Sequence, residues 1–223
     1  MPYSIGWFVV AVTLAAFQTS PEEFKTIDSA RESFQNANAL VAALQLSRGD
    51  WAADVGAGAG YYAMRMSEVA GPEGKIFAQD ITESSIARLK ARVKAFNLEN
   101  VEVIKGDAND PKLPSGKLAA VLVVDTYHHF ANHKEMLEKI FDSLKPGGRL
   151  VIADYSFAEH RALPRAEQLK SHEIDPELVQ AEAAETGFKL ARRDDNFVQW
   201  KPGVGNTRAD PTDFWLLVMT RPK

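Results

Sequence analysis

The sequence has no cysteine among its 223 residues. Disulfide bonds, thiolate nucleophiles and thiolate metal sites are therefore excluded. Cationic residues are outnumbered by acidic ones. The sequence has 26 lysines and arginines and 30 aspartates and glutamates, which gives a formal net charge of -4. No broad cationic surface is expected, so nucleic acid is not an expected partner.

Long apolar runs are scarce as well. One uncharged run, IGWFVVAVTLAAF, covers residues 5–17 and is too short to cross a bilayer comfortably. It has the length of a signal-peptide core, but no lysine or arginine precedes it. Residues 1–20 are therefore either an export leader or a segment that packs on the protein, and only residues 5–17 could contact a membrane. We expect residues 21–223 to form a single domain.

From residue 21 onward, the hydrophobic pattern alternates between strand and helix periods. Strands are predicted at residues 51–55, 75–81, 101–107, 118–125, 149–155, 188–194 and 213–220, with a polar loop at 196–212. Helices are predicted at residues 30–46, 61–70, 83–96, 133–144 and 176–186. The segment LAAVLVVD, residues 118–125, has no polar alternation, as expected for a strand covered on both faces. This order predicts a doubly wound α/β fold with a mostly parallel seven-stranded sheet, helices on both faces and an antiparallel C-terminal hairpin.

The segment DVGAGAGYY, residues 54–62, joins the first predicted strand to a helix. Its glycines, Gly56, Gly58 and Gly60, would let a ligand approach the backbone near the positive end of that helix. Asp80 ends the next strand, where a carboxylate can accept hydrogen bonds from both hydroxyls of a ribose. The loop and Asp80 together indicate a ligand that contains a nucleoside.

Two cofactors fit this pattern. Gly58, Gly60 and Ala63 spell G-x-G-x-x-A, which matches the fingerprint of NAD-dependent oxidoreductases. This match to the NAD fingerprint does not use Asp54 or Gly56. The complete segment, in contrast, fits an acidic-x-G-x-G-x-G loop. The chain also ends in a predicted antiparallel hairpin rather than in a second, substrate-binding domain. NAD is therefore the alternative cofactor.

Five motifs in order resemble those of the class I S-adenosylmethionine-dependent methyltransferases. They are DVGAGAG, AQDI, KGDANDPKLP, VLVVDTYHHF and LKPGGRLVIADY. From about Phe34 onward, the chain looks most like a bacterial group of predicted methyltransferases with an apolar N-terminal leader, related more distantly to quinone-biosynthesis and arsenite methyltransferases. The absence of cysteine argues against arsenite as the acceptor, because that chemistry depends on cysteine thiolates in the family.

The resemblance implies that S-adenosylmethionine is the cofactor. It implies that Asp54 and the turn Gly56–Gly60 hold the methionine half of the cofactor. Asp80 would bind the ribose hydroxyls, and Ile81 would lie against the adenine. Carboxylates at strand ends suit this cofactor, because it carries a sulfonium and an ammonium group.

The resemblance also implies contacts from the third and fourth strands. Asp107 and Ala108 would meet the edge of the adenine, and Asp125 would lie near the sulfonium and amino groups. Alternatively, Asp54 caps the following turn, and Asp107 is an ordinary turn residue in GDANDP.

The segment DTYHH, Asp125–His129, follows the fourth predicted strand. We expect it to form the floor of the acceptor pocket, because doubly wound sheets bind ligands at the carboxyl ends of their strands. Tyr127 and His128 would orient the acceptor, and His128 is a candidate general base. The alternative is that His128 is a hydrogen-bonded structural histidine.

The remaining histidines receive no catalytic role. His129 and His133 have the i, i+4 spacing of metal ligands on one helix, but Asn132 is a plausible N-cap, which would leave His129 before that helix. No metal site is therefore predicted. His160 and His172 lie in a polar segment that we expect to cover the strand ends.

Three functions remain for experiment. The first is methyl transfer from S-adenosylmethionine to an unidentified small-molecule acceptor. The second is NAD-dependent oxidoreduction, and the third is a non-catalytic S-adenosylmethionine-binding protein of the envelope. Cofactor supply favours the cytoplasm over export, and the sequence does not predict the oligomeric state.

Overall fold

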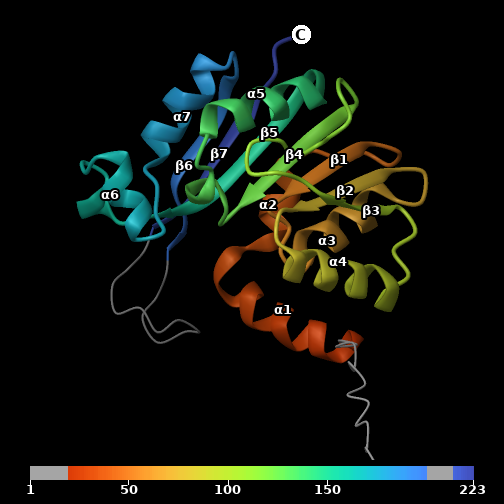
Figure 1. The fold of residues 1–223 in the computed structure, drawn as a ribbon. Helices are drawn as coiled ribbons and strands as arrows, with labels where there is room; N and C mark the ends of the chain where they lie inside the picture. Colours follow the sequence, from red (N-terminus) through yellow and green to blue (C-terminus); the bar gives the residue numbers. More distant parts are fainter. Residues whose placement is uncertain (1–19, 200–212) are drawn as a thin grey trace, which may run out of the picture.

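The computed structural model describes residues 20–199 and 213–223. Their strands form one seven-stranded sheet in the order β3-β2-β1-β4-β5-β7-β6 (Figure 1). The strands are β1 (Trp51–Val55), β2 (Lys75–Asp80), β3 (Val101–Lys105), β4 (Leu118–Val124), β5 (Leu144–Ser156), β6 (Lys189–Gln199) and β7 (Asp213–Thr220). Neighbouring strands are parallel except around β7, which is antiparallel to both β5 and β6. The predicted fold class and its antiparallel hairpin are confirmed.

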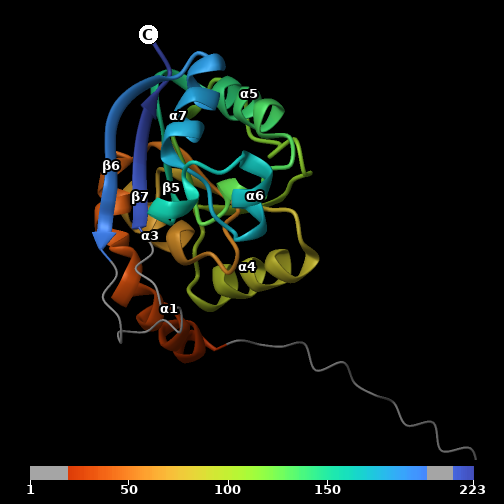
Figure 2. The same ribbon diagram turned by 90° about the vertical axis from the view of Figure 1, so that its left-hand side faces the viewer.

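Helices cover both faces of the sheet (Figures 1 and 2). One face carries α2 (Ala37–Ala43), α3 (Tyr61–Ala70) and α4 (Glu83–Ala95), and α1 (Pro21–Gln35) contacts α4. The other face carries α5 (His133–Ser143) and α7 (Pro176–Glu185). The short elements are the 3-10 turns η1 (Tyr127–His129) and η2 (Ala158–His160), and helix α6 (Arg165–Lys170). Within the described ranges, none of the helices has the length and apolar character needed to span a bilayer.

The central strand β4 supplies side chains to both hydrophobic cores. Leu122 and Val124 pack in the core beneath α3, whereas Val121 and Val123 pack in the core beneath α5. Successive strand residues point to opposite faces, so a strand covered on both sides must be apolar at every position. The unbroken apolar run that predicted this strand follows from that double burial.

The predicted helix over residues 30–46 is wrong, because the structure has two helices there. Asn36 separates α1 from α2 by adopting a left-handed conformation with φ of 44°. Asparagine tolerates this conformation better than most residues. Helix α1 also begins earlier than predicted, since the Ser20 hydroxyl accepts from the Glu23 backbone while the Glu23 carboxylate accepts from the Ser20 backbone.

Two strand boundaries also differ from the prediction. Strand β5 begins at Leu144 and includes the sequence KPGG, whereas the predicted strand began at residue 149. Strand β6 continues to Gln199, beyond the predicted end at residue 194. Residues 1–19, with the predicted leader, and residues 200–212, with most of the predicted loop, lie outside the described residues.

A buried ion pair connects α1 to the glycine loop through α4. Arg92 donates to both carboxylate oxygens of Asp28 at 2.7 and 2.9 Å. Its Nε donates to the carbonyl oxygen of Ala59, and its guanidinium lies 4.2 Å from the centre of the Phe24 ring. The side chains of Arg92 and Asp28 are only 1% and 9% exposed. One guanidinium therefore holds the first helix and the loop that follows β1.

Replacing Arg92 with alanine should lower the free energy of unfolding by about 3–5 kcal/mol, because the Asp28 carboxylate would stay buried without its partner. Urea denaturation measures this change. The control is Arg88→Ala on the exposed side of α4, which should change stability by no more than about 0.5 kcal/mol. Equal urea midpoints for the two variants would show that the buried pair contributes little.

Candidate functional site

The parallel strands end at one edge of the sheet, and the strand order reverses between β1 and β4. Val55 at the end of β1 lies beside Gln79 of β2 and Val123 of β4. Doubly wound sheets bind their ligands outside such a reversal. The loops after β1 and β4 meet there, since the Thr126 hydroxyl lies 3.5 Å from the carbonyl oxygen of Gly56.

Two positions of the first loop are glycine for different structural reasons. Gly56 has φ of 75°, and a Cβ there would lie 2.2 Å from a side-chain carbon of Thr126. Gly58 has φ of 56°, yet a Cβ there would meet nothing within 4 Å. Gly56 is therefore needed for the close approach of two loops, whereas Gly58 presents bare backbone to open space.

The Asp80 carboxylate organises this loop. Its Oδ2 accepts from the Gly58 N–H at 3.0 Å, and its Oδ1 accepts from the N–H groups of Ile81 and Thr82 at 2.8 and 3.0 Å. A carboxylate can accept about four hydrogen bonds, so Oδ2 retains capacity for a further donor. Asp80 is thus fixed in place and still able to accept from a ligand hydroxyl.

Asp54 is almost fully buried, with 2% of its surface exposed. Its Oδ2 accepts from the backbone N–H of Ala63 at 3.0 Å, in the first turn of α3. This is the capping role that the sequence left open for Asp54. The carboxylate also complements the positive end of the helix, so it fixes both ends of the glycine loop.

The residues after β2 and β3 lie at the surface. Ile81 is 48% exposed, so its apolar side chain is accessible for contact with a flat ring. Asp107 and Ala108 are also exposed, and the Asp107 carboxylate forms an ion pair with Lys112 at 2.9 Å. Asp107 therefore combines a turn position with accessibility to a ligand.

The segment after β4 points its side chains in different directions. Asp125 is exposed and has a left-handed backbone with φ of 52°, a conformation that is uncommon outside glycine. Tyr127 is fully buried, and its hydroxyl donates to the Glu182 carboxylate of α7 at 2.6 Å. Burial and the charge of Glu182 raise the pKa of Tyr127. The phenol therefore stays protonated and binds α7.

His128 is held by a carboxylate that the sequence analysis did not assign to the site. Its Nδ1 lies 2.9 and 3.0 Å from the two carboxylate oxygens of Asp154, and its backbone N–H donates to Asp154 at 3.2 Å. Asp154 is fully buried at the end of β5. The carboxylate favours a proton on Nδ1 and so places the imidazole lone pair on Nε2. The position of Asp154 at a strand end was the signal that could have found it.

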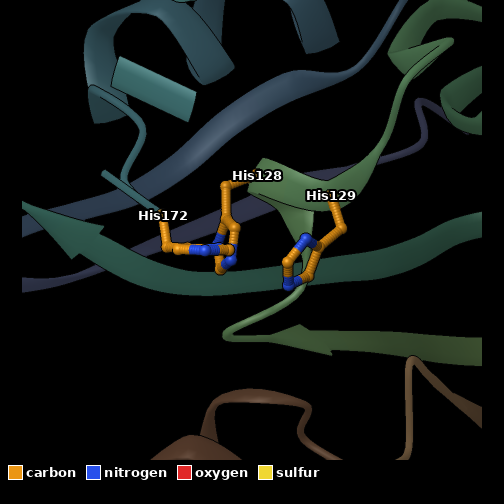
Figure 3. A group of neighbouring side chains, drawn as sticks. All are labelled: His128, His129 and His172. Carbon is orange, nitrogen blue, oxygen red and sulfur yellow. The ribbon is translucent and has the colours of Figure 1, made fainter. Parts of the chain in front are cut away.

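Three imidazoles gather at this point (Figure 3). The ring centre of His128 lies 4.0 Å from that of His129 and 5.5 Å from that of His172. Burial and the two neighbouring imidazoles lower the pKa of His129. His129 precedes α5, whose N-cap is Asn132, so it does not share a helix with His133.

Residues 157–175, here called the covering segment, bring His172 to the other two histidines (Figure 3). The segment is held at its end by Trp215, whose indole N–H donates to the carbonyl oxygen of Ile174 at 2.9 Å. Arg161 donates to the Ser156 hydroxyl at 3.2 Å and lies 3.8 Å from the Asp195 carboxylate of β6. His172 lies 44 residues after His128, and its approach to His128 could not be predicted from the sequence. The path of this long connection depends on tertiary contacts such as these.

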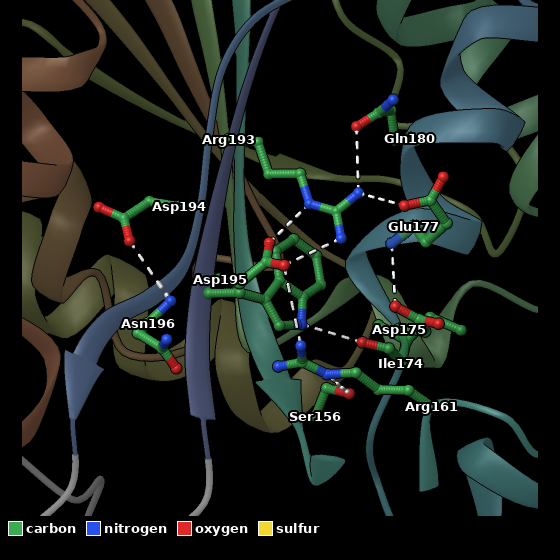
Figure 4. Close-up of polar contacts among 11 residues, drawn as sticks. Ser156, Arg161, Ile174, Asp175, Glu177, Gln180, Arg193, Asp194, Asp195 and Asn196 are labelled. Carbon is green, nitrogen blue, oxygen red and sulfur yellow. Dashed lines mark hydrogen bonds and ion pairs between the residues drawn. The ribbon is translucent and has the colours of Figure 1, made fainter.

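Arg193 of β6 connects Asp195, the partner of Arg161 in the covering segment, to α7 (Figure 4). It pairs with Asp195 at 2.6 Å and with Glu177 at 2.5 Å. The hydrogen bond and charge of Arg193 lower the pKa of Asp195. These partly exposed pairs fix the geometry of the region more than they stabilise the protein.

The residues at the strand ends fit S-adenosylmethionine. Gly58 offers open backbone, Asp80 offers an acceptor for a ribose hydroxyl, and Ile81 offers an apolar surface. Asp125 adds an exposed carboxylate on the β4 side, where a sulfonium would be stabilised. A sheet with these features defines a class I S-adenosylmethionine-dependent methyltransferase fold.

Residues 46–196 match a family of methyltransferase domains. The match covers more than half of the chain, so the protein belongs to this family.

Curated relatives match over part of their length. Protein-L-isoaspartate O-methyltransferase of Ignicoccus hospitalis is 34% identical over 113 residues, which are 51% of this chain and 51% of that protein. Demethylmenaquinone methyltransferase of Listeria welshimeri is 28% identical over 113 residues, 51% of this chain and 48% of that protein. The chain therefore spans about half the length of these relatives.

Solved structures show the same fold. A SAM-dependent methyltransferase from Aquifex aeolicus has a TM-score of 0.70 and 22% identity, and the alignment covers 91% of this chain and 98% of that one. An arsenic (III) S-adenosylmethionine methyltransferase from Chlamydomonas reinhardtii has a TM-score of 0.59 and 15% identity, over 79% of this chain and 64% of that one. At these identities the likeness concerns the fold.

Gly58→Ala should weaken the binding of S-adenosylhomocysteine by about 1–3 kcal/mol, because a methyl group would stand where the ligand approaches the backbone. The control is Gly116→Ala, since Gly116 also has a left-handed backbone, with φ of 65°, and open space around it. Both variants should lose a similar stability, about 1–2 kcal/mol, from backbone strain. Calorimetric titration separates them, and equal affinities would place the ligand away from Gly58.

Proposed function

We propose that the protein transfers the methyl group of S-adenosylmethionine to a small-molecule acceptor at the carboxyl ends of β1, β2, β4 and β5. The observation that carries this proposal is the juxtaposition of two half-sites across the strand reversal. Gly58 and Asp80 form the half that suits the cofactor, and Asp125 and His128 form the half that suits an acceptor.

The cofactor residues act in two ways. Ile81, Asp107 and Ala108 are exposed along the ends of β2 and β3, and Asp80 is 9% exposed; these four would contact the ribose and adenine. A second set shapes the loop that receives the methionine half, namely Asp54, Gly56, Gly58 and Gly60. Asp125 would face the sulfonium. When bound, the cofactor supplies a methyl group that is already activated, so the chain's residues need only to align and activate the acceptor.

His128 is the residue that we propose acts on the acceptor. Asp154 fixes the orientation of its ring and keeps the lone pair on Nε2. Tyr127 acts as a positioning residue, because its hydrogen bond to Glu182 holds η1 against α7. The side chain of His128 is 3% exposed, so only a small reacting group can reach it.

The names of the relatives include both a protein and a quinone acceptor. A small-molecule acceptor is favoured here because the covering segment brings His172 against His128. His172 thereby narrows the access of an acceptor to His128. Labelled S-adenosylmethionine mixed with the full chain and metabolite extracts would identify the acceptor. Label that enters only proteins would replace the small-molecule class with a protein acceptor.

Asp80→Ala should weaken S-adenosylmethionine binding by about 1–3 kcal/mol, because the ribose hydroxyls lose a charged acceptor. Glu83→Ala removes the same charge from an exposed position three residues away and should leave affinity unchanged. Titration of the unaltered chain with NAD should give no binding heat. NAD binding without S-adenosylmethionine binding would instead identify an oxidoreductase.

His128→Gln should lower turnover about 10²-fold or more while cofactor affinity is kept, because the side chain that activates the acceptor is lost. His133→Ala is the control, since His133 lies on α5 beside Glu182 and outside the acceptor half-site. Urea denaturation of both variants shows whether His128→Gln is folded. A folded His128→Gln variant with normal turnover would make His128 a structural residue.

A further inference from the structure

We propose that His128, His129 and His172 bind one divalent metal ion of the zinc type beside the acceptor half-site. One nitrogen from each imidazole can be chosen so that all three lie within 4.8 Å of one another. Ligands of a tetrahedral zinc ion, at about 2.0–2.1 Å from the metal, are separated by about 3.4 Å. Modest side-chain rotations would therefore close the three nitrogens around an ion.

The three ligands differ in how firmly they are held. His128 is buried, and Asp154 binds its Nδ1 with both carboxylate oxygens. A histidine that donates one ring N–H to a carboxylate and offers the other nitrogen is the usual arrangement at metal sites, because the carboxylate fixes the ring and increases its basicity. His129 and His172 are exposed, so an ion can enter from solvent.

The backbone of His172 gives an independent indication. His172 has φ of 55°, a left-handed conformation that costs free energy for a residue with a side chain. This conformation occurs at the residue of the covering segment whose ring reaches His128 and His129. Asp125, the other residue at this site with positive φ, belongs with His128 and Asp154 to a second group whose oxygen and nitrogen atoms lie within 4.8 Å.

The donor set selects the kind of ion. Three imidazole nitrogens suit zinc, cobalt, nickel or copper, whereas magnesium and calcium prefer oxygen ligands. Three protein ligands are also the number that catalytic zinc sites use, because they leave a coordination position for water or substrate. Asp125 and Asp154 supply negative charge near the ion.

The ion would define the acceptor class, and this step rests on the proposed function. A hydroxyl group of the acceptor that coordinates the ion loses its proton to water more readily. The resulting oxygen forms the new carbon–oxygen bond, and the electron pair of the carbon–sulfur bond returns to sulfur. A phenol or an enol is the acceptor that this arrangement favours. His128 would then activate the acceptor through the metal rather than by taking its proton.

Metal binding is tested with the full chain, freed of any affinity tag and stripped with a chelator. Calorimetric titration with zinc chloride should show one ion per chain. Cobalt chloride should give the visible absorption of a low-symmetry cobalt site. His129→Ala and His172→Ala should each weaken zinc binding at least tenfold, and both positions are exposed, so these variants should fold.

Asp154→Asn should weaken zinc binding by about 10–100-fold through its effect on His128. The matched controls are His133→Ala and His160→Ala, whose imidazoles pair with Glu182 and Glu173 instead. Zinc affinity that is unchanged in both His129→Ala and His172→Ala, or a folded chain without micromolar zinc binding, would overturn the proposal. Titration with S-adenosylmethionine in the same samples separates the two ideas. Cofactor binding without zinc binding removes only the metal site. Zinc binding without cofactor binding keeps the metal site but removes the proposed function and the acceptor class that rests on it.

Discussion

The pairing of β1 with both β2 and β4 is the constraint on which the site depends. Because the chain winds away in opposite directions from this pair, the helices after β1 and β4 cover opposite faces of the sheet. The two loops must then pass each other at the strand ends. Gly56 permits that contact, since any side chain there would collide with Thr126. The open backbone at Gly58 and the polar segment after β4 are both consequences of this crossing.

Arg92 extends the same constraint to the N-terminal helix. Its guanidinium binds the Ala59 carbonyl oxygen in the glycine loop and the Asp28 carboxylate of α1. If a ligand displaced the loop, Arg92 would transmit the displacement to α1. Loss of the contact with α1 would likewise remove a constraint on the loop. The cost of separating such a buried pair, about 3–5 kcal/mol, is a substantial fraction of the net stability of a domain, so the position of the loop is coupled to that of α1.

Features set by local chemistry were predictable from the sequence, and features set by distant contacts were not. The apolar run of β4 and the N-cap Asn132 were predicted correctly, because each depends on neighbouring residues. The break at Asn36 was missed, since its left-handed backbone interrupts a pattern that continues on both sides. The partnership of His128 with Asp154 joins adjacent strand ends and could have been inferred from the fold. The approach of His172 could not, because the covering segment is fixed by Trp215 and Asp195, which lie later in the chain.

Charge balance relates the two halves of the site. A sulfonium and a divalent ion bound at the two halves of the site would repel each other, because both are cations. Asp125 and Asp154 lie where they can offset that repulsion, since their carboxylates and His128 form one group within 4.8 Å. Asp125 is exposed, whereas Asp154 is buried against His128. In the proposed arrangement, the exposed carboxylate of Asp125 would offset the charge of both cations.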